Sequence, residues 1–246
     1  MPTQCVRDCF DSPNLTCYGL DMFMNVDIIS DTICPWCFVG KRRFESALAE
    51  RPDIQVEVHW RTFQLNPEMP SEGIDRREYV NQKFGNEEKA HTVYDNIRKV
   101  GEIEGIHFDF EAIPRTPNTI NSHRLIRWAG SAGFQDAVVE CLFERYFIQG
   151  ADISSQKELI DVARQVGMDA DLVSGLFKLG EDIELVRNED KAARAMGVNA
   201  VPCFVFAKKY VVFGAQEPDA FKELFNHIAR EAESEAGEPD SVDLGA

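Results

Sequence analysis

The sequence predicts an α/β protein in which a mixed β-sheet is interrupted by a large all-helical insertion. Three observations predict this fold class. A strand–helix–strand pattern occupies residues 24–63, strand patterns return at residues 203–213, and the block between them shows helical periodicity with glycines ending its segments. The simplest compact arrangement is one four-stranded sheet with the helical block inserted in its middle.

The first unit begins with the apolar segment MNVDIIS, which predicts a buried strand over residues 24–30. Apolar residues on one side predict a helix from Pro35 to Glu50. The segment IQVEVHWRTF, residues 54–63, alternates apolar and polar positions as a half-buried strand does. A strand, a helix and a second strand in this order predict a right-handed unit with parallel strands.

The end of the helical block and the following strands are also marked in the sequence. The last helical segment ends at Gly197, because glycine suits the left-handed conformation that follows many helices. The segment CFVFAKKYVVFG predicts an antiparallel hairpin of residues 203–206 and 210–213. Glu217 and Pro218 then begin a final helix, as the helix dipole and proline geometry favour.

These patterns divide the chain into four parts. The N-terminal stretch shows no helical or strand period, and methionines at 22 and 24 directly precede the first convincing strand. The last residues are acidic and show no pattern. The expected parts are a disordered or mis-called leader (1–22), a sheet domain (23–66 and 197–231), a helical insertion domain (67–196) and an acidic disordered tail (232–246).

Composition limits the classes of partner. The chain has 246 residues, 44% of them hydrophobic, and a formal net charge of −16. Such a surface repels nucleic acid phosphates and anionic membranes, so we expect neither as a partner. No apolar run is long enough to span a bilayer, and the first residues lack the features of a signal peptide. We therefore expect a cytoplasmic protein, in which disulfides are usually transient and catalytic.

Two of the seven cysteines lie in DIISDTICPWCFVGKRRF, where a strand is followed by a helix. With Cys34 as the N-cap, Pro35 takes the first helical position, where its missing N–H costs nothing. The Cys37 N–H could then donate to the Cys34 sulfur, and the helix dipole would stabilise the thiolate. Cys34 would be the nucleophile and Cys37, one turn on and more buried, the resolving thiol of an exchange reaction.

Two other interpretations of the pair stay open. A zinc site would need further ligands, which only Cys5 and Cys9 could supply at poor spacing, so we expect no metal. Two structural thiols are the second alternative, since buried cysteine is common. A proline directly after an N-cap cysteine is not typical of a core thiol.

Further motifs carry a resemblance to a known family. With CPWC and the downstream segment GVNAVPCF (197–204), the chain resembles the thioredoxin superfamily, in which a cis-proline loop faces the C-x-x-C pair. It resembles in particular the DsbA-like subgroup with a helical insertion. It is most similar to the FrnE-like branch, which carries CPWC followed by F-x-G-K-R-x-F. The other segments that resemble this branch are WRTFQLNPEMP (60–70), RTPNTINSHRLIRWA (115–129) and GAQ (214–216).

The resemblance implies a thioredoxin-like fold over residues 24–230 and a thiol–disulfide oxidoreductase. Cys34 would be the nucleophile and Cys37 the resolving thiol. Pro202 would follow a cis bond, with the Val201 backbone edge receiving an extended substrate strand. The partners would be protein or small-molecule thiols and disulfides and a redox regenerating partner, with the protein as monomer or homodimer. No cofactor is needed, and glutathione is a candidate co-substrate.

Other residues near the pair are secondary candidates. Trp36 stands where oxidising DsbA proteins have histidine, so one cation is missing beside the thiolate and we expect a weaker oxidant. Asp31 could accept a proton, although an ordinary capping or surface carboxylate is the simpler interpretation. His123 and Asn118 could line a cleft between the insertion and the sheet. Cys203 is expected to be a core thiol rather than a third redox group.

Two competing functions are retained beside the oxidoreductase. The kappa glutathione transferases and hydroxychromene carboxylate isomerases resemble this architecture, but they carry serine at the position of Cys34 and need no resolving thiol. A non-catalytic, chaperone-like binding module is the other, supported by the large insertion. A substitution at Cys37 separates the oxidoreductase from the glutathione-dependent enzymes, because only a dithiol cycle requires that sulfur.

Overall fold

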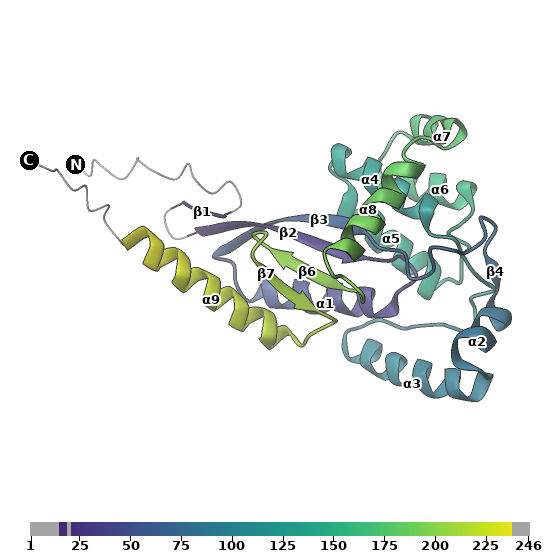
Figure 1. Cartoon of the computed structure of the whole chain (residues 1–246), viewed down its shortest axis with the longest axis horizontal. Helices are drawn as coiled ribbons and strands as arrows, with labels where there is room; N and C mark the ends of the chain where they lie inside the picture. The colour runs from purple at the N-terminus through teal and green to yellow at the C-terminus, as the bar shows by residue number, and fades with distance from the viewer. Residues whose placement is uncertain (1–14, 19–20, 238–246) are drawn as a thin grey trace, which may run out of the picture.

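A five-stranded mixed sheet lies at the centre of the molecule (Figure 1). The computed structural model describes residues 15–18 and 21–237. β2 pairs in parallel with β3 along one edge and antiparallel with β1 and β6 along the other, and β7 pairs antiparallel with β6. The strands of this sheet are β1 (Leu15–Tyr18), β2 (Asp21–Ser30), β3 (Ile54–Thr62), β6 (Cys203–Phe206) and β7 (Tyr210–Phe213).

The helices separate into those that cover the sheet and those between β3 and β6. α1 and α9 pack against each other beside the sheet, whereas α4, α5 and α8 contact the edge strand β3. A small two-stranded antiparallel sheet of β4 (Ile74–Asp75) and β5 (Arg115–Thr116) adds to the insertion. The helices are α1 (Pro35–Ala49), α2 (Arg76–Phe84), α3 (Glu87–Ile103), α4 (Ile120–Ala132), α5 (Gln135–Phe147), α6 (Gln156–Val166), α7 (Ala170–Leu179), α8 (Ile183–Ala195) and α9 (Pro218–Gly237).

Two clusters of phenylalanine rings hold α1 in place. Phe44 contacts rings from β6 and α9, at centroid distances of 5.6 Å to Phe204 and 5.6 Å to Phe221. One and a half turns earlier, Phe38 packs on the insertion, with its centroid 5.1 Å from that of Phe143 in α5. Fully burying one such side chain contributes about 1.5–3 kcal/mol. α1 is therefore fixed on both sides, and its N-terminus lies where the sheet meets the insertion.

The fold class expected from the sequence is confirmed. The first strand–helix–strand unit has its two strands in parallel, and the hairpin of β6 and β7 has the predicted bounds and antiparallel pairing. Gly197 has a φ of 90°, the left-handed conformation expected where the last insertion helix ends. The insertion between β3 and β6 is likewise present, but it is not all-helical, because β4 and β5 pair within it. The main sheet has five strands rather than the expected four, because β1 adds to it.

The expectations for the two ends of the chain are wrong for their described parts. Residues 15–18 form β1 and residues 21–22 already belong to β2, because the two strands make a hairpin that continues the edge where β6 pairs. α9 continues to Gly237, since the alanines and glutamates after residue 230 are good helix formers. The rest of the expected leader and tail, with Cys5 and Cys9, lies outside the described residues.

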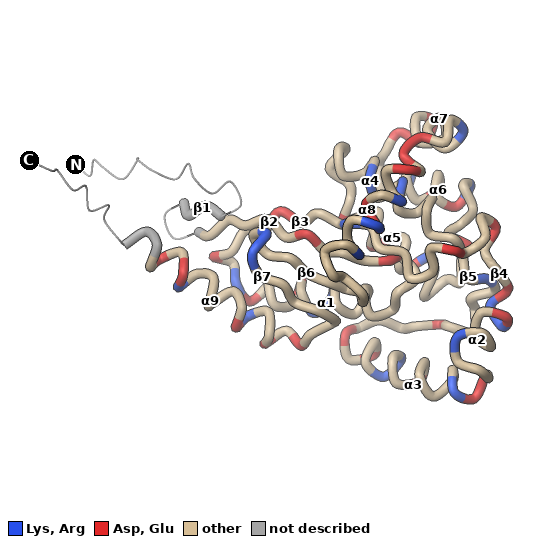
Figure 2. The backbone as a smooth tube through the Cα atoms, viewed as in Figure 1, with Lys and Arg blue, Asp and Glu red and all other residues tan. Residues whose placement is uncertain are grey.

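Charge and hydropathy show no feature of a membrane-spanning segment in the described part of the chain. None of its helices is long and apolar enough to cross a bilayer. Lys and Arg positions are interspersed with Asp and Glu positions along the backbone in Figure 2. The strands at the centre of the sheet are mostly uncharged there, in keeping with their burial.

Candidate active site

The two cysteines of CPWC lie at the N-terminus of α1. Cys34 is the N-cap, with an extended backbone (φ −95°, ψ 109°), and Pro35 follows at the first helical position. Both sulfur-bearing residues are buried, Cys34 with 4% and Cys37 with 1% of its surface exposed. Both are free thiols and their side chains interact. The predicted order of burial is therefore confirmed.

The contacts of the Cys34 sulfur differ from the expected cap. No backbone amide donates to Sγ. Instead the Cys37 N–H donates to the Cys34 carbonyl oxygen at 3.0 Å, and the Cys34 thiol donates to the Val201 carbonyl oxygen at 3.5 Å. A protonated thiol donates to the nearby carbonyl and is only a weak acceptor, whereas a thiolate would accept strongly from the helix amides. The expected capping bond is therefore absent from the free-thiol form.

The loop that carries Val201 and Pro202 packs directly on α1. The Val201–Pro202 peptide bond is cis, as expected from the resemblance. Gly40, one and a half turns into α1, lets the loop approach, because a Cβ there would lie 2.9 Å from Pro202 Cγ. From the other side, the Gly214 N–H donates to the Pro202 carbonyl oxygen at 2.8 Å. The glycine in F-x-G-K-R therefore brings this loop over the cysteines.

Cys37 lies deeper than Cys34, in an environment that favours the neutral thiol. Burial, the largest cause, and the neighbouring Cys34 raise the pKa of the Cys37 thiol well above its ordinary value. The Ser30 hydroxyl and the Asp31 backbone act in the opposite direction and are weaker. The two sulfurs are therefore in unequal positions, because Cys34 is the N-cap and Cys37 lies within the first turn of the helix.

Asp31 and His123 meet beneath the cysteine turn. Asp31 is fully buried, which makes the interpretation as an ordinary surface carboxylate wrong. One of its oxygens accepts the Leu65 N–H at 2.7 Å. The other lies 3.4 Å from Nε2 of the buried His123, and neither of these two atoms has a hydrogen-bond partner among the described residues. A buried carboxylate and imidazole thus face each other next to the turn, whose Cys34 N–H donates to the Asp31 carbonyl.

The segment that begins α4 attaches the insertion to the cysteine turn. Ser122 and Thr32 join their hydroxyls at 2.8 Å, one residue from each partner of the Asp31–His123 contact. Asn118 is structural: its amide donates to the Met69 carbonyl at 2.6 Å, and its side-chain oxygen accepts the Ile120 N–H at 2.9 Å. His123 therefore lies between sheet and insertion as predicted, whereas the Asn118 side chain is occupied in holding the backbone.

Trp36 is the most exposed residue of the motif, with 38% of its surface accessible, while Pro35 is half-buried. Both side chains therefore form the outer rim of the cysteine turn. An indole donates one N–H and carries no charge, so Trp36 brings no cation to the rim.

The basic residues after the motif are not a solvated face. Lys41 is buried and pairs with Asp136 at 3.1 Å and with Glu140 at 3.0 Å, as well as with Glu45. Burial alone would lower the pKa of Lys41, but Asp136, Glu45 and Glu140 together raise it. Arg42 also pairs with Glu140. Lys41 and Arg42 therefore hold α1 to α5 through these carboxylates.

Two further described thiols lie away from the cysteine turn or in the core of the sheet. Cys203 is fully buried on β6, where burial raises its pKa to about 11. Cys141 is buried on α5, and burial raises its pKa too. Within the described ranges, no group of three or more His, Cys, Asp or Glu residues is arranged to hold a metal ion. Sequence reasoning missed the Thr32–Ser122 contact, because the two residues lie 90 positions apart and no local pattern pairs them.

Comparisons with known proteins agree with this geometry. A family model described as DSBA-like thioredoxin domain matches residues 25–226. The uncharacterised protein YwbO of Bacillus subtilis is 25% identical over 206 residues, which cover 83% of this chain and 97% of that protein. A probable DsbA oxidoreductase from Streptomyces coelicolor has a crystal structure with a TM-score of 0.75 and 28% identity, covering 84% of this chain and 90% of that chain.

A structural neighbour of another activity is also similar. A 2-hydroxychromene-2-carboxylate isomerase aligns with a TM-score of 0.62 over 87% of this chain and 98% of that chain, at 16% identity. At that identity the likeness concerns the fold alone. The fold by itself therefore does not separate the candidate reactions, and the side chains at the helix end must do so.

Proposed function

Because the chain belongs to the DSBA-like thioredoxin domain family, we propose that it exchanges dithiols and disulfides through Cys34 and Cys37. One observation carries this proposal: two free thiols interact at the N-terminus of α1, directly under the loop of Val201 and Pro202. Exchange needs one sulfur that attacks and a second within reach to displace the product. The two sulfurs, with their unequal burial, meet that requirement.

In the reducing direction, the Cys34 thiolate attacks one sulfur of a substrate disulfide. A bond forms between Cys34 and that sulfur, the substrate S–S bond breaks, and the other substrate sulfur leaves as a thiolate that takes a proton. Loss of the thiol proton frees the Val201 carbonyl from Cys34. The helix N-terminus then stabilises the negative sulfur, which is why this thiol acts first.

The second step uses Cys37. Its thiolate attacks the Cys34 sulfur, the Cys34–Cys37 disulfide forms and the second substrate thiol leaves. Two electrons have passed from the dithiol to the substrate, and a thiol-bearing regenerating partner must return them. Glutathione is a chemically suitable candidate, because its thiol can reduce the disulfide by the same exchange reaction.

The raised pKa of Cys37 means that its proton must be removed before the second step. We assign that task to the facing pair of Asp31 and His123, whose facing atoms have no other hydrogen-bond partner among the described residues. His123 also lines a small pocket of about 80 Å³ between β3, α4 and α8, which could connect the pair with solvent. The pair would be a proton carrier rather than a nucleophile.

An extended peptide would bind at the Val201 edge. The Val201 N–H donates no hydrogen bond within the described ranges, and its carbonyl accepts only the Cys34 thiol. Backbone groups left open beside a nucleophile suit addition of a substrate strand. Protein disulfides are therefore proposed as substrates, with small disulfides as the simplest members of the same class.

The glutathione-dependent isomerase or transferase is the second candidate, favoured by the structural likeness to the isomerase. The two functions differ in their need for Cys37. A dithiol cycle stops without it, whereas glutathione-dependent isomerisation continues.

The test is a Cys37→Ser variant incubated with a peptide disulfide. We expect a stable mixed disulfide on Cys34 when no other thiol is added, detected by the added mass of one half of the peptide. With glutathione or dithiothreitol present, turnover should be much slower than in the unsubstituted protein, because only the added thiol can then release the peptide. Cys141→Ser is the matched control, since that thiol is buried away from the site on α5. Turnover equal to that of the unsubstituted protein in Cys37→Ser would contradict the dithiol cycle and favour the second candidate.

A further inference from the structure

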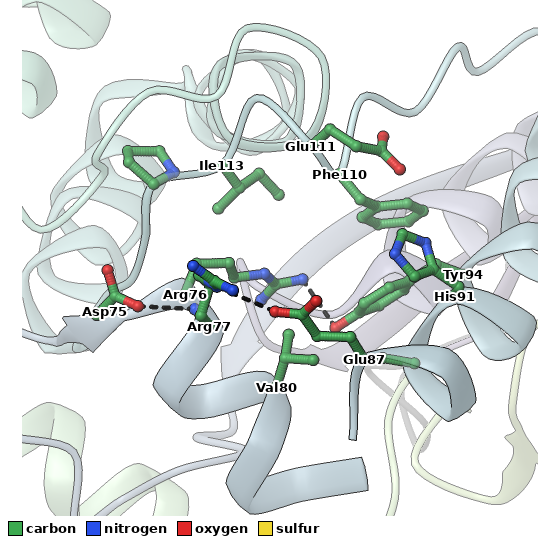
Figure 3. A pocket seen from close by; sticks show the side chains of 12 residues that line it. Asp75, Arg76, Arg77, Val80, Glu87, His91, Tyr94, Phe110, Glu111 and Ile113 are labelled. Carbon is green, nitrogen blue, oxygen red and sulfur yellow. Dashed lines mark hydrogen bonds and ion pairs between the residues drawn. The ribbon is translucent and has the colours of Figure 1, made fainter. Parts of the chain in front are cut away.

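A pocket of about 470 Å³ opens in the insertion between α2, α3 and residues 110–114 (Figure 3). We call it the insertion pocket. None of the residues that hold the cysteines lines it. Its volume lies within the range of about 300–1,000 Å³ typical of small-molecule sites.

The walls of the insertion pocket are mainly apolar. Val80 of α2, Ala90 of α3, and Phe110 and Ile113 of the facing segment line it, and all four belong to the buried core. Figure 3 shows Val80 and Ile113 on opposite sides of the space. Apolar walls of this kind favour a ligand with an aromatic or branched body, because burial of such a body removes apolar surface from water.

Arg76 brings a positive charge into this apolar space. Its guanidinium donates to Tyr94 Oη at 2.8 Å and to Thr116 Oγ1 at 3.2 Å, and it lies 5.2 Å from the centroid of the Tyr94 ring. Both acceptors are neutral, and no ion pair joins Arg76 to a carboxylate in the described part of the chain. Two of the five N–H donors of a guanidinium are used in these contacts, so three are left for a ligand.

The other charged groups at the pocket are already occupied. Arg77 pairs with Glu87 at 3.0 Å, a contact drawn as a dashed line in Figure 3. Glu111 pairs with Arg98 at 2.8 Å. Asp75 caps α2 by accepting two of its backbone amides, so this helix end has no free donors for an anion there. Among the Arg and Lys residues that line the pocket, only the Arg76 guanidinium has no carboxylate partner within the described ranges. One such cation suits a ligand with a single negative charge rather than a phosphate group.

The buried hydroxyl of Tyr146 lies close enough to Arg76 to be affected by its charge. Tyr146 is buried, and its hydroxyl has no hydrogen-bond partner among the described residues. Burial raises the pKa of Tyr146, while the charge of Arg76 acts in the opposite direction. The phenol therefore stays neutral and does not compensate the guanidinium. Low dielectric surroundings strengthen the attraction between such a charge and an incoming anion.

We propose that the insertion pocket binds a small monocarboxylate with an aromatic or branched apolar body, whose carboxylate is held by Arg76 and whose body lies against Val80, Phe110 and Ile113. A planar guanidinium matches a carboxylate by two parallel hydrogen bonds, which no ammonium group can do. The site is separate from the cysteines, and this proposal does not depend on the proposed reaction.

Calorimetric titration of the full chain with 3-phenylpropionate tests the proposal, with the neutral 3-phenylpropionamide as the matched ligand. We expect the acid to bind and the amide to bind at least tenfold more weakly. Arg76→Gln is expected to weaken binding of the acid by about ten- to a hundredfold, the effect of losing a charged hydrogen-bond partner. Arg77→Gln, which changes an exposed neighbour on the same helix, should keep the affinity within about threefold.

Three results would overturn the proposal: no binding of the acid up to 10 mM, equal binding of acid and amide, or unchanged affinity in Arg76→Gln. If Arg76→Gln fails to fold, Arg76→Lys replaces it, because it keeps the charge and loses only the paired hydrogen bonds. That variant must still weaken binding of the acid severalfold. Cys34→Ser must bind the acid normally, since loss of binding there would place the ligand at the cysteines instead.

Discussion

Two buried sulfur environments in the sheet domain differ in a way that supports the exchange reaction proposed for one of them. At the N-terminus of α1, Cys34 and Cys37 interact with each other and with the loop of Val201. On β6, Cys203 is paired between Ile29 of β2 and Phe213 of β7 and is fully enclosed. Burial alone raises the pKa of Cys203 to about 11, which favours its neutral thiol. In the proposed exchange, a thiol takes part because it lies at a helix N-terminus beside a second sulfur. Lying near the cysteine turn, as Cys203 does, is not enough.

The largest expected effect comes from exchanging serine for one sulfur of each environment. Cys34→Ser is expected to reduce turnover of a peptide disulfide to the uncatalysed rate, because no other described thiol is the N-cap of a helix. Cys203→Ser should keep turnover close to that of the unsubstituted protein. Steady-state reduction of the peptide by glutathione measures both. Loss of turnover in Cys203→Ser, with the fold intact by circular dichroism, would show that Cys203 takes part in the reaction. It would contradict the proposed difference between the two sulfur environments.

A smaller effect is expected from the buried carboxylate below the cysteine turn. Asp31→Asn should slow the step that resolves the mixed disulfide by on the order of 100-fold, since a proton acceptor is lost. Stopped-flow measurement of that step across pH checks it, because loss of a proton acceptor also changes the shape of the pH–rate profile.

Asp190 provides the matched control for Asp31. It is also buried and accepts the N–H of Gln64, the neighbour of the residue that Asp31 holds. Asp190→Asn should destabilise the loop without changing the pH–rate profile of the resolving step. If the two variants give the same profile, Asp31 is a structural group and not a proton acceptor.

The close approach of the loop to α1 can be tested with glycine substitutions. Gly40→Ala should destabilise the protein by about 1 kcal/mol, since overpacking against Pro202 costs more than the gain in helix propensity. It should also slow exchange severalfold by shifting Val201 from Cys34. Gly175→Ala on α7, where a Cβ meets nothing within 4 Å, should instead stabilise by about 0.5–1 kcal/mol. Chemical denaturation measures the free energy of unfolding of both variants. Equal stability changes would show that a Cβ at residue 40 fits against Pro202 without strain.

The smallest effect concerns the pH dependence of stability. The pKa of Cys203 is raised in the folded state, so its neutral thiol stabilises the fold below the unfolded pKa, and this contribution is lost as pH rises towards about 11. The free energy of unfolding of the reduced protein should therefore fall between about pH 9 and pH 11 more steeply than that of Cys203→Ala, by at most about 1.4 kcal/mol per pH unit. Parallel slopes for the two proteins would mean that Cys203 ionises normally in the fold.

Much of the fold followed from local patterns. Alternating apolar positions and the short hairpin predicted the bounds of β3, β6 and β7 to within a residue, because strand period and turn chemistry are written in neighbouring residues. The resemblance to DsbA-like proteins is confirmed by the family match, while the FrnE-like branch and the cytoplasmic location stay predictions. β1 escaped prediction because a four-residue strand acquires its stability from pairing with β2, which its own residues do not reveal.

The sequence by itself determined the helix that begins at CPWC and the strand before it, since these depend on caps, proline geometry and periodicity over a few residues. Only the tertiary structure decided what surrounds the two sulfurs. The contact of Asp31 with His123, the close approach of Pro202 to Gly40 and the open guanidinium of Arg76 all join residues far apart in the chain. Packing of whole elements, which no local pattern encodes, brings such groups together.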